Sequence, residues 1–185
     1  MGKSLDAFLA PCGRRFSQTA RRPAGPVRQR ELSSFSASRR VPYAAGHVLA
    51  IVADVGSYPE FMPLVKKAII RNCREVDGAR RAFDASVAVA YDRLGISETL
   101  FSHVVVDEQL RTVTATSDEG AVKSLKAVWT ISDEGEGTCA VHLAIDYVMQ
   151  SRPLQFVLAG VIDLVARKIM AAFEERAAKL YASAS

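Results

Sequence analysis

The middle of the chain alternates apolar and polar residues with the period of two that is typical of β-strands. Residues 64–148 contain several such stretches, separated by glycine-containing turns at residues 77–78, 119–120 and 134–137. One face of each stretch is apolar and the other is polar, which predicts an antiparallel sheet with one buried and one solvent-exposed face. The apolar faces are Phe83, Ala85, Val87, Val89 and Tyr91; Val113 and Ala115; Leu125, Ala127, Trp129 and Ile131; and Val141, Leu143, Ile145 and Tyr147.

A strand, a helix and a rigid link are predicted before these stretches. Residues 33–41 are small, polar and extended in character, as in a first or edge strand. Apolar residues at helical spacing then predict a helix over residues 44–55 that ends at Gly56, since glycine accepts a positive φ without a Cβ clash. Two prolines in Tyr58-Pro59-Glu60-Phe61-Met62-Pro63 fix φ and remove backbone donors, which predicts a rigid turn or a short helical link.

A long helix is predicted at the C-terminus. Ser151-Arg152-Pro153 combines a capping-type side chain with a proline in the first turn. An apolar stripe follows through about seven turns, or roughly 40–45 Å. Its members are Leu154, Val157, Leu158, Val161, Val165, Ile169, Phe173 and Leu180.

The first half of this helix is apolar on nearly all sides, with Asp163 as the one charge between Pro153 and Ala166. A membrane-spanning helix needs about 20 such residues, so this stretch is too short to span a bilayer. A surface of this kind predicts a second contact besides the sheet. Four alternatives stay open: a ligand, a membrane surface, a second subunit in a homodimer, or burial beneath neighbouring loops.

Charge divides the chain into two regions. Residues 1–40 carry nine basic and two acidic side chains, a net charge of +7, whereas the remaining 145 residues carry 15 basic and 18 acidic side chains, a net charge of −3. A slightly acidic body argues against a nucleic-acid partner, because phosphate contacts need a clustered positive surface. Residues 7–30 are basic and acid-poor, as in an organelle transit peptide. A disordered basic leader and an over-extended bacterial reading frame are the alternatives. We place the leader at residues 1–32 and one domain at residues 33–182.

The chain offers little that is typical of catalysis. Its three cysteines are widely spaced, and His47, His103 and His142 are scattered, so neither a disulfide framework nor a metal site is expected. It contains no G-x-S-x-G, H-E-x-x-H or phosphate-binding glycine motif. Asp84, Asp92 and Glu98 remain as potential acids, although charges near strand ends are usually solvated. The sequence therefore predicts no catalytic residue, no metal and no catalytic cofactor.

Two short motifs carry a resemblance to a known family. Tyr58, Pro59, Phe61 and Pro63 form a Tyr-Pro-x-Phe-x-Pro stretch, and residues 172–177 read Ala-Phe-Glu-Glu-Arg-Ala. Together with the order of elements, they resemble the coenzyme Q-binding, polyketide-cyclase-like branch of the START superfamily over residues 34–181. The chain departs from the family at Leu64 and Val65, where a Trp and a Cys are usual, and at the turn formed by residues 118–122. These departures concern the identity of the ligand more than the fold.

The resemblance implies an α+β helix-grip fold (START/Bet v 1-like). In this fold a curved antiparallel sheet of about seven strands wraps on a long C-terminal helix, with short helices after the first strand. It also implies a non-catalytic lipid chaperone that binds ubiquinone or a related polyisoprenoid lipid and supports respiratory electron transport and quinone biosynthesis. Such a protein would lie at the matrix face of the mitochondrial inner membrane, or in the bacterial cytoplasm if the leader is an over-extended start. A ribosome-associating, toxin-like member of the family and a cyclase- or dehydratase-type enzyme are the alternatives.

The ligand is expected in a hydrophobic tunnel. Many inward-facing strand residues are Ala, Val or Thr, which leaves room inside a curved sheet unless the C-terminal helix fills it. A prenyl tail offers only apolar surface, so its affinity must come from area removed from water. The predicted lining is Phe61, Trp129, Val141, Leu143, Leu158, Val161, Val165, Ile169 and Phe173.

Overall fold

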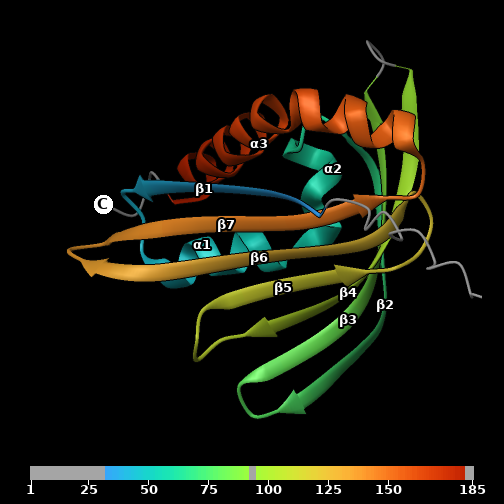
Figure 1. The fold of residues 1–185 in the computed structure, drawn as a ribbon. Helices are drawn as coiled ribbons and strands as arrows, with labels where there is room; N and C mark the ends of the chain where they lie inside the picture. The colour runs from blue at the N-terminus through green and yellow to red at the C-terminus, as the bar shows by residue number, and fades with distance from the viewer. Residues whose placement is uncertain (1–31, 92–94, 182–185) are drawn as a thin grey trace, which may run out of the picture.

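The sheet and helices follow the predicted order in the computed structural model of the protein, which describes residues 32–91 and 95–181. Most of the leader therefore lies outside the described residues. Seven strands form one antiparallel sheet in the order β1-β7-β6-β5-β4-β3-β2 (Figure 1). The elements are β1 (Ser33–Val41), α1 (Ala45–Ala53), the 3₁₀ helix η1 (Val55–Ser57), α2 (Tyr58–Phe61), β2 (Val65–Asp77), β3 (Arg80–Tyr91), β4 (Ile96–Asp107), β5 (Thr112–Ser117), β6 (Val122–Gly135), β7 (Thr138–Met149) and α3 (Arg152–Tyr181).

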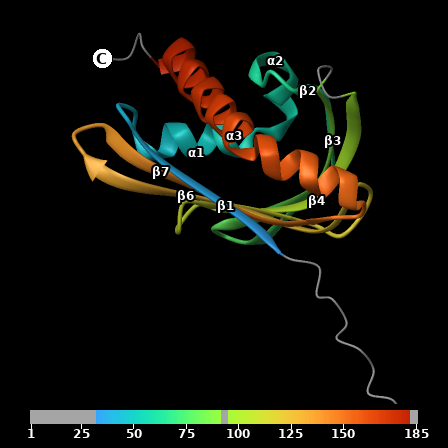
Figure 2. The ribbon, with the colours of Figure 1, turned by 45° about the horizontal axis from the view of Figure 1, so that its top comes forward.

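The three α-helices lie on the same, concave side of the curved sheet, and α3 crosses it diagonally (Figure 2). Alternation along the strands turns side chains such as Phe83, Val106 and Leu143 into the core, where each is at most 2% exposed. Hairpins join β2 through β7 in sequence, and β1 closes the order by pairing with β7 from Ser33↔Tyr147 to Val41↔Cys139. The predicted helix-grip architecture is confirmed.

The first helix ends earlier than predicted. α1 stops at Ala53, and the backbone N–H of Asp54 donates to the carbonyl oxygens of Ala50 and Ile51. The chain then turns through η1, which contains Gly56 without a positive φ. Gly56 as the terminal residue of the helix was therefore wrong, because the Asp54 side chain and backbone hold the turn by accepting hydrogen bonds from Ser57. The link at residues 58–63 contains the short helix α2, as predicted.

α3 begins where the sequence places it, and the Leu154 N–H donates to Ser151 Oγ over 3.3 Å. The predicted stripe is not uniformly covered. The fully buried residues of α3 all lie from Ala166 onward: Ala166, Met170, Ala172, Phe173 and Ala177. Two members of the stripe, Val157 and Leu180, are 37% and 50% exposed. Val157 lies at the margin of the stripe, and Leu180 is one residue from the end of the helix.

Candidate functional site

A cavity of about 340 Å³ lies between the concave face of the sheet and α3. Its sheet side is built mostly from small or aliphatic residues of β2 to β7, together with Trp129, and its helix side from five residues of α3 that follow one another at intervals of three or four positions. The first half of α3 contributes no fully buried residue, so it covers the sheet without filling the space beneath it. Lining residues from these two sides include Ala85, Val87, Val89, Leu100, Val113, Ala115, Ala127, Ile145, Leu158, Val161, Val165 and Ile169.

Seven of the nine residues predicted to line a tunnel do line this cavity. They are Trp129, Leu143, Leu158, Val161, Val165, Ile169 and Phe173. Val141 instead borders a separate small pocket beside α1, of about 20 Å³, on the far side of Trp129 and Phe173. Phe61 lies behind the cavity wall, where its ring packs against Tyr58 and Phe173. The structure thus brings seven of the residues together around one space and leaves two behind its wall.

An aromatic cluster closes one end of the cavity. The ring of Phe173 contacts Trp129, Phe61 and Tyr58 at centroid distances of 4.9, 5.4 and 5.5 Å, all in edge-to-face geometry. Edge-to-face pairs of this kind stabilise by about 0.5–1.5 kcal/mol beyond the area that they bury. Phe173 and Leu158 mark the limits of the α3 lining, and 15 residues of helix separate them by about 22 Å. The cavity is therefore elongated along residues 158–173 of the helix.

Tyr58 is a lining residue whose hydroxyl is already engaged. It donates a hydrogen bond of 2.6 Å to the carbonyl oxygen of Val52 in α1. Loss of solvent raises the pKa of this hydroxyl well above its usual value, and the negative charge of Asp54 raises it further. The hydroxyl is therefore neutral at physiological pH and ties α2 to α1.

The cavity is almost free of polar chemistry. Ser102 of β4 supplies the other hydroxyl of the lining, and none of the described lining residues is Asp, Glu, His, Lys or Arg. A site of this composition suits an apolar ligand, and its described residues provide no pair of side chains for general acid–base catalysis.

The family motif contributes to the site in a way that its sequence pattern alone does not indicate. Tyr58 and Pro63 line the cavity, Phe61 supports Phe173, and Pro59 lies in the first turn of α2. Sequence reasoning also left Val87, Val89 and Leu100 out of the tunnel. The period-two alternation of β3 did mark Val87 and Val89 as inward-facing, so that signal was available.

The polar groups singled out from the sequence lie elsewhere. Asp84 accepts hydrogen bonds from His103, with 2.9 Å between Nδ1 and Oδ1, and from Asn72 over 2.7 Å, on the solvent-exposed face of the sheet. The bond from His103 and then that from Asn72 lower the pKa of Asp84. Glu98 does not line the cavity, and Asp92 lies outside the described residues.

The other histidines also have structural contacts. His47 stacks on Tyr181 at 4.0 Å between ring centroids, and His142 Nδ1 is 2.8 Å from Ser38 Oγ. Within residues 32–91 and 95–181, no group of three His, Cys, Asp or Glu side chains is placed to hold a metal ion.

Comparison with known families assigns the fold. The model of the family described as polyketide cyclase/dehydrase and lipid transport matches residues 41–174. The chain belongs to this family. The resemblance noted in the sequence is therefore confirmed, together with its START-like fold.

Individual relatives carry different functions. The chain is 28% identical over 149 residues to the mitochondrial coenzyme Q-binding protein coq10 of Schizosaccharomyces pombe, covering 80% of this chain and 88% of that protein. It is 23% identical over 150 residues to a ribosome association toxin of Vibrio cholerae, covering 81% of this chain and 99% of the toxin.

Two solved structures illustrate the spread of the fold. An aromatase/cyclase from Streptomyces sp. R1128 superposes with a TM-score of 0.70 at 16% identity, covering 84% of this chain and 99% of the cyclase. An 18 kDa protein of Caulobacter crescentus superposes with a TM-score of 0.69 at 29% identity, covering 81% of this chain and 99% of that protein. No helix in the described part of the chain is long and apolar enough to cross a membrane.

Proposed function

We propose that the protein binds ubiquinone, or a related polyisoprenoid lipid, in the cavity beneath α3 and does so without catalysing a reaction on it. The observation that carries the proposal is the elongated apolar cavity with no charged side chain among its described lining residues. The similarity of the sequence to a coenzyme Q-binding protein over 80% of the chain supports ubiquinone as the ligand.

The cavity suits such a ligand in size and chemistry. Its volume of about 340 Å³ lies within the range of roughly 300–1,000 Å³ that is usual for small-molecule sites. A prenyl tail gains affinity from burial at ~25 cal/mol per Å² of apolar area, and the lining provides the matching apolar surface. In this proposal the seven lining residues of the predicted set contact the ligand, whereas Phe61 and Val141 hold the wall behind Phe173 and Trp129.

The composition of the lining supports binding without turnover. Cyclisation or dehydration of a polyketide needs groups that transfer protons to and from the substrate. Here the Tyr58 hydroxyl is committed to Val52, and the acids Asp84 and Glu98 lie outside the cavity. The cyclases among the structural neighbours share the fold at under 25% identity, and a fold by itself does not carry an activity.

We further propose that the protein supports respiration and quinone biosynthesis as a lipid chaperone at the matrix face of the mitochondrial inner membrane. The mitochondrial relative and the basic composition of residues 7–30 support this location. The likeness to a protein of Caulobacter crescentus supports the alternative, a protein of the bacterial cytoplasm. Amino-terminal sequencing of the mature protein from its native source separates the two, since an intact Met1 contradicts cleavage of a transit peptide.

Association with the ribosome is the second candidate, because relatives named as ribosome association toxins match 81% of the chain. The net charge of −3 over residues 41–185 speaks against a phosphate-rich partner. Co-sedimentation with ribosomal subunits tests this candidate directly.

Substitution of Val161 by Phe tests the ligand site. Val161 lines the cavity, so the added ring should occupy ligand space and weaken quinone binding roughly tenfold or more, while thermal stability changes little. Binding of a short-chain ubiquinone can be followed by quenching of Trp129, the single tryptophan of the chain, which also lines the cavity.

Val157→Phe is the matched control, because Val157 is one turn earlier on the same helix and does not line the cavity. This variant should bind quinone as the wild type does. If Val161→Phe instead overpacks a filled core, it should lose about 1–3 kcal/mol of stability with quinone binding unchanged. That result would contradict the proposed site.

A further inference from the structure

The first half of α3 presents a second apolar face that no part of the described structure covers. Pro153, Phe156, Val157, Gly160 and Leu164 follow the spacing i, i+3, i+4, i+7 and i+11, so they lie along one side of the helix. All five are exposed, with Phe156 at 78% and Leu164 at 42%. We call these five residues the outer stripe. Burial beneath neighbouring loops, one of the alternatives left open by the sequence, is therefore contradicted within the described residues.

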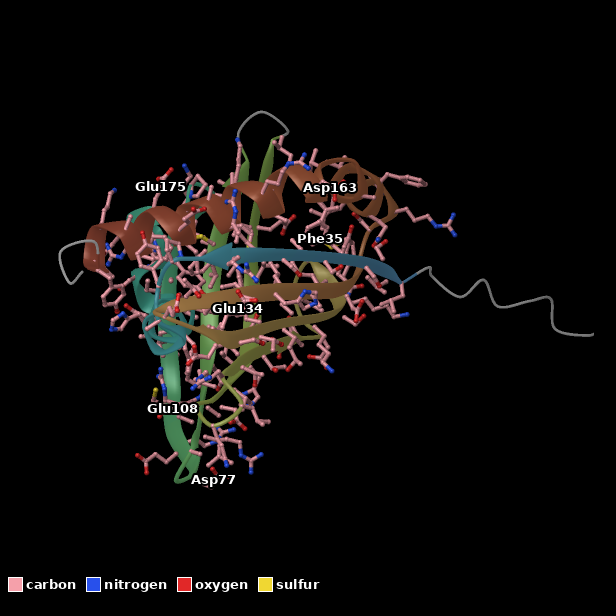
Figure 3. The ribbon with its side chains drawn as sticks, turned by 90° about the vertical axis from the view of Figure 1, so that its left-hand side faces the viewer. Phe35, Asp77, Glu108, Glu134, Asp163 and Glu175 are labelled. Atoms are coloured by element: carbon pink, nitrogen blue, oxygen red, sulfur yellow. The ribbon has the colours of Figure 1, made fainter. Side chains whose placement is uncertain are left out.

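The outer stripe is bounded by cations. Arg152 precedes it, and Arg167 and Lys168 follow on the same side of the helix in the next turn; all three are exposed. Asp163, labelled in Figure 3, is the one acid in this half of α3 and lies at the margin of the stripe. An apolar face with basic residues at both ends matches a bilayer surface, where acyl chains accept the rings and anionic phosphates accept the cations.

Its size favours a bilayer over a second copy of the chain. From Pro153 to Leu164 the stripe is about 17 Å long, and a helix is about 10 Å wide, which gives an area on the order of 200 Å². A stable protein–protein interface needs about 800 Å² from each partner. A single short stripe is therefore too small for a dimer by itself, whereas membrane binding by an interfacial helix scales with its buried apolar area and is strengthened by attraction to anionic lipids.

The position of the stripe links it to the cavity. On the adjoining side of the same half of α3, Leu158, Val161 and Val165 line the cavity. No residue between Arg152 and Val165 is fully buried, so this half of the helix is held to the sheet by partial packing and by the Gln155 side chain, which accepts a hydrogen bond from the Met149 N–H and donates one to Ser33 Oγ. A lipid that is insoluble in water has to enter the cavity from a membrane. The helix that covers the cavity also carries the outer stripe, which suits a bilayer surface.

We propose that the outer stripe docks the protein on an anionic bilayer and places the part of α3 that covers the cavity against the lipid. Its role in ligand transfer rests on the proposed function, whereas docking itself does not.

The test measures co-sedimentation of the full chain with vesicles of phosphatidylcholine alone and of phosphatidylcholine mixed with phosphatidylglycerol. The double variant Phe156→Ser/Leu164→Ser should bind both kinds of vesicle at least about tenfold more weakly than the wild type. Leu110→Ser is the matched control, because Leu110 is 68% exposed in the turn between β4 and β5, away from α3, and should bind as the wild type does. The net charge of +7 in residues 1–40 is present in every variant, so it does not affect the comparison.

A second pair of substitutions tests the cations. Arg167→Gln/Lys168→Gln should reduce the preference for phosphatidylglycerol and leave binding to phosphatidylcholine unchanged. Wild-type vesicle binding by the Phe156/Leu164 variant would overturn the proposal. Sedimentation velocity could also overturn it. If the wild type is a dimer and the Phe156/Leu164 variant is a monomer, a second copy of the chain covers the stripe.

Quenching of Trp129 by a short-chain ubiquinone without vesicles separates this proposal from the proposed function. The Phe156/Leu164 variant should bind the quinone as the wild type does. If the wild type binds vesicles through the stripe but no quinone, docking stands and the proposed function fails.

Discussion

At the scale of single residues, Tyr58 explains why the family motif has its composition. The ring lines the cavity and packs edge-on against Phe61 and Phe173, while the hydroxyl donates to Val52. Pro59 fixes φ in the first turn of α2, which holds the tyrosine in place with little conformational freedom to lose. A motif that reads as a rigid turn in the sequence thus joins α1, α2 and α3 at the aromatic end of the site.

Replacement of Tyr58 by Phe should cost about 1 kcal/mol of stability at neutral pH, because the Val52 carbonyl oxygen loses its donor. The pKa of this hydroxyl is raised in the folded state, so its stabilising effect is present below the unfolded-state pKa of about 10 and is lost as the pH rises above it. Above pH ~10, the free energy of unfolding of the wild type should fall by about 1.4 kcal/mol per pH unit relative to the variant. Urea unfolding at several alkaline pH values measures this difference, and parallel pH curves would contradict it.

At the scale of elements, α3 consists of two halves with different surroundings. The second half is anchored by Ala166, Met170 and Phe173, whereas the first half covers the cavity without a buried residue. Local stability follows burial and packing, so the two halves should open to different extents although they form one continuous helix.

Hydrogen exchange should detect this difference. Backbone amides of residues 157–165 should exchange faster than those of residues 167–178 in the ligand-free protein. A short-chain ubiquinone should slow exchange in the first half more than in the second, because it fills the space that the first half covers. Equal protection of both halves without ligand would contradict the account of α3.

Some features of α3 could be predicted from the sequence and others could not. The start of α3 could be predicted because Ser151 and Pro153 are local signals of a helix N-terminus. The inward positions of Val161 and Val165 followed from helical periodicity. Periodicity gives the direction of a side chain but not the distance to the layer opposite. It therefore could not show which half of α3 is buried, nor that Val157 and Leu180 are exposed.

The sheet gives a similar lesson. Alternation and turn glycines predicted the strands, but the pairing of β1 with β7 joins residues about a hundred positions apart and has no local signature. Likewise, Phe61 and Val141 were predicted to line the cavity because they are apolar and lie beside the right elements. Their place behind Phe173 and Trp129 depends on packing across α1, α2 and the sheet, which no pattern along the chain records.

At the scale of the whole molecule, the fold alone does not determine the function. Proteins named as coenzyme Q-binding, ribosome-associating and cyclase proteins are all similar to this chain. The lining of the cavity is what supports our proposal, because its apolar composition suits a lipid and no acid–base pair is found among its described residues.

Native mass spectrometry tests the central claim most directly. Full-length protein would be purified from a host that makes ubiquinone, without added lipid, and its mass compared before and after solvent extraction. The account predicts an adduct of one ubiquinone per chain in the wild type, identified in the extract by chromatography, and its loss in Val161→Phe but not in Val157→Phe. A phospholipid or fatty acid at the same stoichiometry, or a protein that stays ligand-free even after incubation with ubiquinone, would contradict it.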